Sequence, residues 1–312
     1  QFSKKHGVTI AAGKAVFSDA LKFNLAPLSR ITITINYRKA PKEPTVHMGS
    51  RTTSYILRGI STPNTNFSKA FKEDHWFNIS GIDVYDPTAS SIAILGNSIT
   101  DGKGSTNNAQ NRWPDFMSEI MNANPEKDPA KKDWTGVLNL GIGDNRILSV
   151  GLGEPGRIRF DRDILEQRGL RAVIIFEAIN DIGTSKAPDE TSRQLIEAYH
   201  VMISKAKARG LKVYMGTITP FRGCKSYFTE EREKARKVVN DWIRTTKEID
   251  GFIDFDALMR DPSEPEQLRK EWQSGDWLHP NPDGYKMMGE FAAKQLSKQT
   301  TPGNGFSTVT VR

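Results

Sequence analysis

Two different patterns of apolar and polar residues divide the chain near residue 88. Before that point, residues 30–36 alternate strictly, with isoleucines on one face and threonines on the other, which predicts a half-buried antiparallel strand. Further strands are expected at residues 8–10, 55–57 and 77–84, joined by loops rich in Ser, Thr, Asn and Pro. We therefore predict a small β-sandwich or jelly-roll-like accessory domain over residues 1–88, whose few strands would not complete two sheets.

After residue 88, short apolar runs alternate with longer segments of helical period. The apolar runs predict strands at residues 92–95, 136–140, 172–176, 212–217 and 251–254. The longer segments predict helices at residues 113–122, 158–167, 191–208, 229–246 and 282–297. This alternation predicts a three-layer α/β sandwich over residues 89–298, with a parallel five-stranded sheet between two layers of helices. Its functional residues should lie in the loops that follow the strands.

Signals at the ends of elements complete this outline. Thr191 and Gln194 have the spacing of a capping box at the start of the third predicted helix, and Gly210 is expected to end that helix. Beyond the last helix, residues 299–312 form a short tail. The alternating residues 306–311 in this tail could form a strand that returns to the N-terminal β region.

Composition restricts the class of protein. The 312 residues are 37% hydrophobic and 26% charged, which is typical of a soluble globular chain. No window approaches about 18 uninterrupted apolar residues, so no membrane span is expected. The single cysteine, Cys224, excludes an internal disulfide and a cysteine-based zinc site. The net charge is +7, but the basic residues are scattered, which argues against nucleic acid as a partner and leaves an anionic polysaccharide compatible.

The end of the first predicted strand carries a serine between two glycines. Ser98 follows Gly96 and precedes Gly102, at the sheet edge where α/β proteins bind their ligands. It could be a turn serine that bonds its own backbone, or a nucleophile displayed between strand and helix. A phosphate loop is disfavoured, because five residues rather than four separate the glycines and Gly104 follows Lys103 where a hydroxyl residue is needed.

Loops after the other strands contain the remaining groups that acyl transfer needs. Asp276 and His279 lie three residues apart before the last helix, where the imidazole could take the Ser98 proton and the carboxylate could fix its tautomer. The Ser98 amide, an amide of the Gly143–Asp144 turn and the Asn180 side chain could donate to the developing oxyanion. Each residue also has a plain structural interpretation: His279 could cap a helix, Asp276 could be solvated, and Asn180 could brace a turn.

Three segments of the chain resemble sequence blocks of the SGNH (GDSL-like) hydrolases, namely Gly96–Gly102, Asn180–Asp181 and Asp276–Pro280. The resemblance covers about residues 90–297. It is closer still to one branch, the secreted esterases similar to those of bacterial xylan-degradation clusters, in the segments Asn111–Asp115, Ile179–Gly183 and Ser274–Asp276. In that branch a β-sandwich precedes the hydrolase, which agrees with the prediction for residues 1–88.

The resemblance implies specific roles. Ser98 would be the nucleophile, His279 the base and Asp276 the acid that orients the base. The Ser98 amide, Asp144 and Asn180 would form the oxyanion hole. The implied activity is that of a serine esterase without a cofactor, which removes small acyl groups, chiefly acetyl, from acylated oligo- or polysaccharides such as xylan. A flavodoxin-like sheet and a secreted or periplasmic location are also implied.

The chain departs from the family pattern at three positions. Asn97 replaces the usual aspartate before the nucleophile, and Ala178 replaces a glycine in the third block. Asp144 stands where the second block usually has a glycine. A backbone N–H can still donate there, but a carboxylate beside a developing oxyanion is unfavourable unless it points away or pairs with a cation such as Arg146.

Substrate contacts and rival functions follow from the same loops. Arg112, Trp113 and Trp277 flank them and could line a sugar site, although the tryptophans could equally pack in the core and Arg112 could form a surface ion pair. If Asp144 has damaged the oxyanion hole, the protein would be a non-catalytic carbohydrate-binding protein. A lipase-like acylhydrolase would need a sizeable apolar lid, which the sequence does not indicate. No metal-ligand set is recognisable, so neither a metal nor another cofactor is expected.

Overall fold

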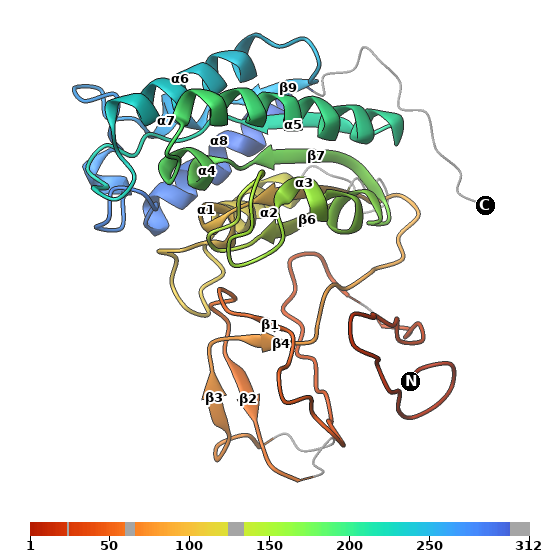
Figure 1. The fold of residues 1–312 in the computed structure, drawn as a ribbon. Helices are drawn as coiled ribbons and strands as arrows, with labels where there is room; N and C mark the ends of the chain where they lie inside the picture. The colour runs from red at the N-terminus through yellow and green to blue at the C-terminus, as the bar shows by residue number, and fades with distance from the viewer. Residues whose placement is uncertain (24, 60–65, 124–133, 300–312) are drawn as a thin grey trace. The chain divides into compact units, whose positions relative to one another are not determined.

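The computed structural model describes residues 1–23, 25–59, 66–123 and 134–299 (Figure 1). The chain divides into two compact units, Gln1–Ile33 and Thr34–Arg312. In the first unit the Asp19 carboxylate accepts the backbone N–H groups of Ser3 and Lys4, at 2.7 and 2.8 Å. The predicted domain boundary near residue 88 stays a prediction, and the predicted tail strand at residues 306–311 lies outside the described residues.

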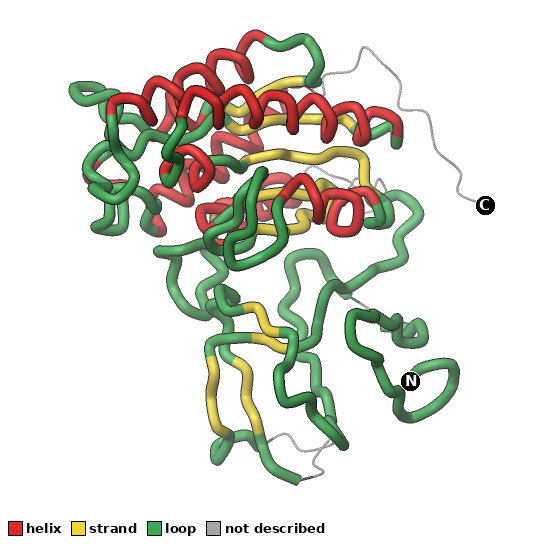
Figure 2. Tube along the Cα trace, viewed as in Figure 1, coloured by secondary structure: helices red, strands yellow, loops and turns green. Residues whose placement is uncertain are grey.

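A five-stranded parallel sheet forms the centre of the second unit (Figure 2). Its strands are β5 (Ser90–Gly96), β6 (Thr135–Gly141), β7 (Leu170–Phe176), β8 (Lys212–Gly216) and β9 (Gly251–Ile253). They lie in the order β6-β5-β7-β8-β9 and every neighbouring pair is parallel. The apolar runs of β5 and β7 are buried, as expected for strands covered on both faces. The predicted parallel sheet is therefore confirmed.

Helices flank this sheet and account for the longer periodic segments. They are α1 (Ser98–Asp101), α2 (Trp113–Asn122), α3 (Gly156–Phe160), α4 (Ile179–Gly183), α5 (Pro188–Ala208), α6 (Glu230–Thr245), α7 (Phe255–Met259) and α8 (Pro282–Gln299), with a π-helical turn η1 (Asp161–Leu165) and a 3-10 turn η2 (Lys270–Trp272). Helix α2 packs against α8, and α5 packs against α6 (Figure 1). None of the helices within the described ranges is long and apolar enough to cross a bilayer.

The start of α5 differs from the prediction. The helix begins at Pro188, with Ala187 as its N-cap residue, so Thr191 lies inside the first turns and does not cap them. The predicted capping box is wrong because proline is favoured at the first helical position, where its missing N–H leaves no bond unmade. The end is as predicted: Gly210 adopts φ +72° and donates its N–H to Lys207 O at 2.8 Å.

Strands of the N-terminal region are few and short. The strand β1 (Val46–His47) pairs antiparallel with β4 (Trp76–Phe77), and β2 (Ser54–Ile56) pairs with β3 (Phe71–Glu73). The predicted strands at residues 8–10 and 30–36 are wrong, because these described residues form no strand, and of the predicted strand at 77–84 only Phe77 lies in one. Ile31, Ile33 and Ile35 are 42%, 46% and 44% exposed. An alternating segment stays a strand only when a neighbour takes its backbone bonds and its apolar face.

Candidate active site

Ser98 is the first residue of α1, directly after the carboxyl end of β5. Asn97 caps this helix, since its Oδ1 accepts the Ile99 N–H at 2.9 Å. A side chain at Gly96 would overlap that of Thr100, so glycine is needed for the tight turn between strand and helix. As the first helical residue, Ser98 has no intrahelical acceptor for its own N–H, which leaves this donor available to a ligand.

The backbone of α1 is locked onto the sheet. A Cβ at Gly141, the last residue of β6, would overlap the Asp101 amide nitrogen, so the two backbones touch there. Asn139 Nδ2 donates to Thr100 O at 2.7 Å, and Trp113 Nε1 lies 3.3 Å from Thr100 Oγ1. The turn that carries Ser98 therefore has little freedom to shift.

Asp276 and His279 share one short loop between η2 and α8. Asp276 Oδ1 accepts the backbone N–H groups of Leu278 and His279, at 3.0 and 2.9 Å. Its other oxygen, Oδ2, lies 2.6 Å from His279 Nδ1. Trp277 between them takes φ +59°, the left-handed conformation that turns the loop back on itself. One carboxylate thus holds both the backbone and the ring of His279.

The structure brings this loop to Ser98. Ser98 Oγ lies 2.8 Å from His279 Nε2. With the proton of Nδ1 facing Asp276, Nε2 is the nitrogen that can accept the Ser98 hydroxyl proton. Partial burial by itself raises the pKa of Asp276, but hydrogen bonds from the His279 ring and from the amides of His279 and Leu278 outweigh it and hold this pKa well below its usual range. Asp276 is therefore an ionised partner for the imidazole.

The three predicted oxyanion donors lie on neighbouring elements of the same edge. Asp144 adopts φ +51° in the turn after β6, and no acceptor among the described residues takes its N–H. Its carboxylate oxygen Oδ1 instead pairs with Arg146 Nη2 at 3.0 Å. The negative charge that would oppose an oxyanion is thus compensated by a neighbouring guanidinium.

Asn180 lies in the first turn of α4, directly after β7. Ala178, before this helix, adopts φ +91°, a left-handed conformation that explains why a glycine is usual at this position. Asp181 ties α4 to the loop after β6, because its carboxylate accepts the N–H groups of Ile147 and Leu148, both at 2.9 Å. Burial raises the pKa of Asp181 to about 6, although these two amides and Arg146 act in the opposite direction.

Tyr227 was not predicted from the sequence as a site residue. It lies in the loop between β8 and α6, and its hydroxyl donates to Asn180 Oδ1 at 2.8 Å. The two residues are 47 positions apart, and no motif marks Tyr227. Only the packing of the loop after β8 against α4 brings them together.

Two of the three predicted sugar contacts face inward, which corrects that expectation. Trp113 has no exposed surface and packs edge-on against Phe255, with ring centroids 5.3 Å apart. The Arg112 guanidinium is buried and donates to the backbone oxygens of Asp101, at 2.9 Å, and Ser50. Both side chains support the Ser98 helix from inside, because the hydrophobic and hydrogen-bonded surroundings leave them no face for a ligand.

Trp277 remains a candidate contact for a substrate. Its side chain is half-buried, and its Cγ would lie 2.7 Å from a Cβ placed on Gly223, so the indole packs directly on the backbone of the loop after β8. It stands two residues before His279, on the loop that carries the imidazole. A flat ring fixed beside the reacting groups is suited to contact a sugar face.

Asp101, the last residue of α1, binds residues of the N-terminal region. Its side chain is only 4% exposed, and its Oδ1 lies 2.6 Å from His47 Nε2. Arg51 Nη1 forms a longer ion pair with its Oδ2, at 3.7 Å. Gly49 leaves room for this carboxylate, since a Cβ there would overlap it. The helix that begins with Ser98 is therefore anchored at its far end by residues 47–51.

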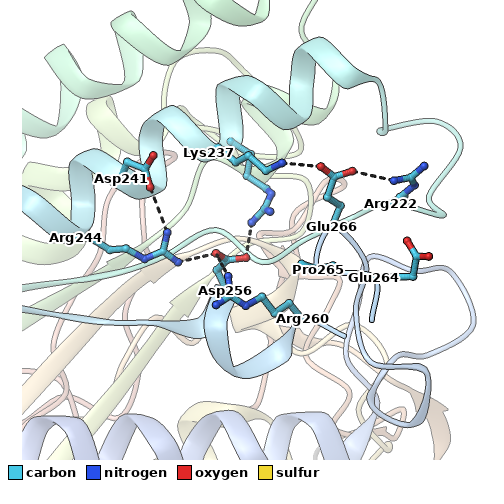
Figure 3. A pocket seen from close by; sticks show the side chains of 10 residues that line it. Arg222, Lys237, Asp241, Arg244, Asp256, Arg260, Glu264, Pro265 and Glu266 are labelled. Carbon is cyan, nitrogen blue, oxygen red and sulfur yellow. Dashed lines mark hydrogen bonds and ion pairs between the residues drawn. The ribbon is translucent and has the colours of Figure 1, made fainter. Parts of the chain in front are cut away.

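A cavity of about 450 Å³ lies elsewhere, between α6 and the loop after α7 (Figure 3). Its charged side chains pair with one another: Arg236 and Arg244 with Asp256, at 2.7 and 2.6 Å, and Lys237 with Glu266, at 2.6 Å. The residues that line it include no serine, cysteine or histidine. This cavity therefore lacks the groups of acyl transfer. The described ranges also contain no cluster of three or more His, Cys, Asp or Glu that could hold a metal ion.

Residues 94–287, more than half of the chain, match the GDSL-like lipase/acylhydrolase family, and the chain belongs to this family. No curated protein matches it.

Several solved structures are similar to this chain at low sequence identity. A GDSL-like lipase from Bacteroides thetaiotaomicron is 19% identical, with a TM-score of 0.49, and the match covers 67% of this chain and 88% of that chain. A carbohydrate acetylesterase family member from Sinorhizobium meliloti is 12% identical, with a TM-score of 0.51 and coverage of 67% and 98%. The native aryl esterase of M. smegmatis is 13% identical, with a TM-score of 0.50 and coverage of 67% and 99%.

Proposed function

We propose that the protein is a serine esterase that removes small acyl groups, chiefly acetyl, from the sugar hydroxyls of plant polysaccharides such as xylan. The observation that carries this proposal is the continuous series of hydrogen bonds from Ser98 Oγ to His279 Nε2, at 2.8 Å, and from His279 Nδ1 to Asp276 Oδ2, at 2.6 Å. A serine hydroxyl is a weak nucleophile until an oriented imidazole can take its proton.

The reaction would proceed through an acyl-enzyme. Ser98 Oγ attacks the ester carbonyl carbon while its proton passes to His279 Nε2, and the carbonyl electron pair moves to the oxygen. Collapse of this tetrahedral oxyanion breaks the bond to the sugar oxygen, which leaves with the proton from His279. Water then gives a proton to His279 and attacks the acyl carbon, and collapse releases the free acid and the Ser98 hydroxyl. Asp276 stabilises the imidazolium in both halves.

The exposure of the site to solvent supports an ester substrate whose alcohol part is bulky. The His279 side chain is 12% exposed and that of Asp276 is 44% exposed, so the imidazole lies near the surface rather than at the end of a deep tunnel. A hydroxyl ester on a large polymer needs such access. Trp277 would contact the sugar, and the net charge of +7 would favour a chain with acidic substituents.

A longer acyl group is a second candidate, because the loop after β6 carries two exposed apolar side chains. Val150 and Leu152 are 70% and 75% exposed. Leu152 Cδ1 would lie 3.6 Å from a Cβ placed on Gly143, so this side chain borders the turn that holds the proposed donors. Exposed apolar groups beside a reacting centre can bind a hydrocarbon chain, as a lipase-like acylhydrolase would require.

A non-catalytic carbohydrate-binding role is the third possibility and receives less support. It would require that Asp144 has disabled the oxyanion hole. The pairing of its carboxylate with Arg146 removes the main reason for such a loss.

Hydrolysis of p-nitrophenyl acetate by the protein, by Ser98→Ala and by Ser263→Ala tests the mechanism. Ser263 is an exposed loop serine and serves as the matched control. We expect Ser98→Ala to fold normally and to lose at least about a thousandfold in kcat/KM, while Ser263→Ala matches the unchanged protein. Equal activity in all three would exclude Ser98 as the nucleophile. No activity in the folded, unchanged protein would favour the carbohydrate-binding role.

Substrate class is tested with the active protein. A series of p-nitrophenyl esters from acetate to octanoate should show the highest kcat/KM for acetate, and acetylated xylan should release acetate. If kcat/KM is instead highest for octanoate, and Leu152→Ser abolishes that preference, the lipase-like alternative is favoured.

A further inference from the structure

An asparagine serves an oxyanion hole only in one of its two orientations. The side-chain amide presents an oxygen on one side and an NH₂ group on the other, and only the NH₂ group can donate to a developing negative charge. A rotation of about 180° would turn a lone pair toward that charge instead. Something in the structure must therefore select the orientation of Asn180.

Tyr227 selects it from the oxygen side. Its hydroxyl lies 2.8 Å from Asn180 Oδ1. Burial raises the pKa of Tyr227 to about 12, and the nearby Asp144 charge adds to this effect, so the phenol keeps its proton throughout the working range of an esterase. A protonated phenol that points at the amide favours the carbonyl oxygen on its side.

Asn145 selects the same orientation from the nitrogen side. Its backbone oxygen accepts a hydrogen bond from Asn180 Nδ2 at 2.8 Å. Asn145 is itself buried, with its Oδ1 bound by Arg159 Nε at 3.0 Å and its Nδ2 bound to Glu154 O at 2.8 Å. An NH₂ group has two hydrogens, so one remains after this bond. The two contacts together define the plane and the direction of the amide.

The position of Tyr227 is fixed by its own surroundings. A Cβ on Gly183, in α4, would overlap the Tyr227 ring, so the ring lies flush against that glycine. Arg232 Nη1 donates to Tyr227 O at 3.1 Å, and Arg232 Nε donates to Ser185 O at 3.0 Å, which joins the loop after β8 to the end of α4. The phenol is therefore presented to Asn180 by a rigid frame.

We infer that Tyr227 is a positioning residue for the oxyanion hole: it holds the Asn180 amide so that the free N–H of Nδ2 faces the reacting carbonyl. The inference rests on the proposed esterase function. Tyr227 acts through Asn180 and needs no contact with the substrate. Its removal should therefore affect the transition state more than the binding of the ester.

A double-mutant cycle of Tyr227→Phe and Asn180→Ala tests this inference in the full chain. With p-nitrophenyl acetate, Tyr227→Phe should lower kcat about tenfold with KM within about twofold, and Asn180→Ala should lower kcat about a hundredfold. The double variant should be no slower than Asn180→Ala alone, because Tyr227 has no function without the amide. Independent, multiplicative losses would overturn the inference, as would an unchanged kcat in Tyr227→Phe.

Tyr199→Phe is the matched control. Tyr199 is buried and donates to a backbone oxygen, that of Glu177 at 3.3 Å, and among the described residues no hydrogen bond joins it to Asn180. It should keep kcat within about twofold, and a loss equal to that of Tyr227→Phe would overturn the inference. If Tyr227→Phe does not fold, Gly183→Ala retains the phenol but displaces its ring, and it should lower kcat in the same direction; an unchanged kcat would count against the inference.

Failure of the proposed function gives a different result. In that case the unchanged protein shows no Ser98-dependent hydrolysis, and both ideas are overturned together. Ser98-dependent hydrolysis with an unaffected Tyr227→Phe variant overturns only the role of Tyr227.

Discussion

The carboxyl edge of the parallel sheet and the segment 34–88 are held in place in opposite ways. At the sheet edge, the candidate site residues have several partners: Asp276 holds the backbone and ring of His279, and Asp181 holds two amides of the loop after β6. In the segment 34–88, the strands have only two or three residues and many apolar side chains stay exposed. Side chains that react must be held in position by several contacts, and in this protein the loops at the edge of a buried sheet provide those contacts.

The two regions meet at Asp101. His47 and Arg51 pair with its carboxylate, and Arg112 donates both to its backbone oxygen and to that of Ser50. These contacts join residues 47–51 to α1 and to the buried Arg112 side chain. We expect residues 47–51 to depend on α1, the helix that begins with Ser98, more strongly than α1 depends on them.

The largest effect is expected for a small change at the sheet edge. Gly141→Ala places a methyl group against the Asp101 amide nitrogen and the carbonyl carbon of Thr100, which are backbone atoms that cannot rotate away. We expect a loss of about 3 kcal/mol or more in the free energy of unfolding, together with a loss of activity. Gly81→Ala, in the N-terminal segment, meets nothing within 4 Å and should stay within about 0.5 kcal/mol. Chemical denaturation measures both, and equal effects would contradict the contrast between the regions.

A buried acid at the end of β7 gives an intermediate effect that depends on pH. Burial raises the pKa of Glu177 well above its usual value, although the Arg159 charge opposes this. Among the described residues neither carboxylate oxygen has a hydrogen-bond partner of normal geometry. Because the folded pKa exceeds the unfolded one, the contribution of Glu177 to stability is complete below about pH 4.5 and declines as the pH rises toward the folded pKa.

Glu177→Gln removes that titration. The free energy of unfolding of the variant, relative to that of the unchanged protein, should rise by about 1–3 kcal/mol between about pH 4 and pH 8. The reason is that the buried amide has no proton to lose. Thermal or chemical unfolding at several pH values measures the difference. A difference independent of pH would mean that Glu177 titrates alike in the folded and unfolded chain.

The smallest effect is expected where the N-terminal segment meets α1. His47→Ala removes a partner of Asp101, but Arg51 remains close and the His47 side chain is itself partly exposed. We expect the free energy of unfolding to fall by about 1 kcal/mol and kcat to decrease by less than about threefold. His75→Ala is the control: the His75 ring bonds the Met48 backbone oxygen of the same segment, and this change should leave kcat unchanged. A large fall of kcat in His47→Ala would show that the nucleophile depends on this segment.

The sequence by itself determined the alternation of strands and helices, the parallel sheet, and the position of Ser98 at the end of β5. It also determined that Asp276 and His279 share one loop, because a spacing of three residues is a local property. A strand that is covered on both faces appears in the sequence as an apolar run. These features can therefore be predicted without knowledge of distant contacts.

Only the tertiary structure decided what depends on partners far along the chain. Residues 30–36 alternate as a strand should, yet they form no strand with any described part of the chain, and Arg112 and Trp113 turn inward to support α1. Tyr227 reaches Asn180 across 47 residues without any motif. A hydrogen bond between such residues exists only because packed elements bring two loops together. The local sequence pattern does not predict which loops lie close in space.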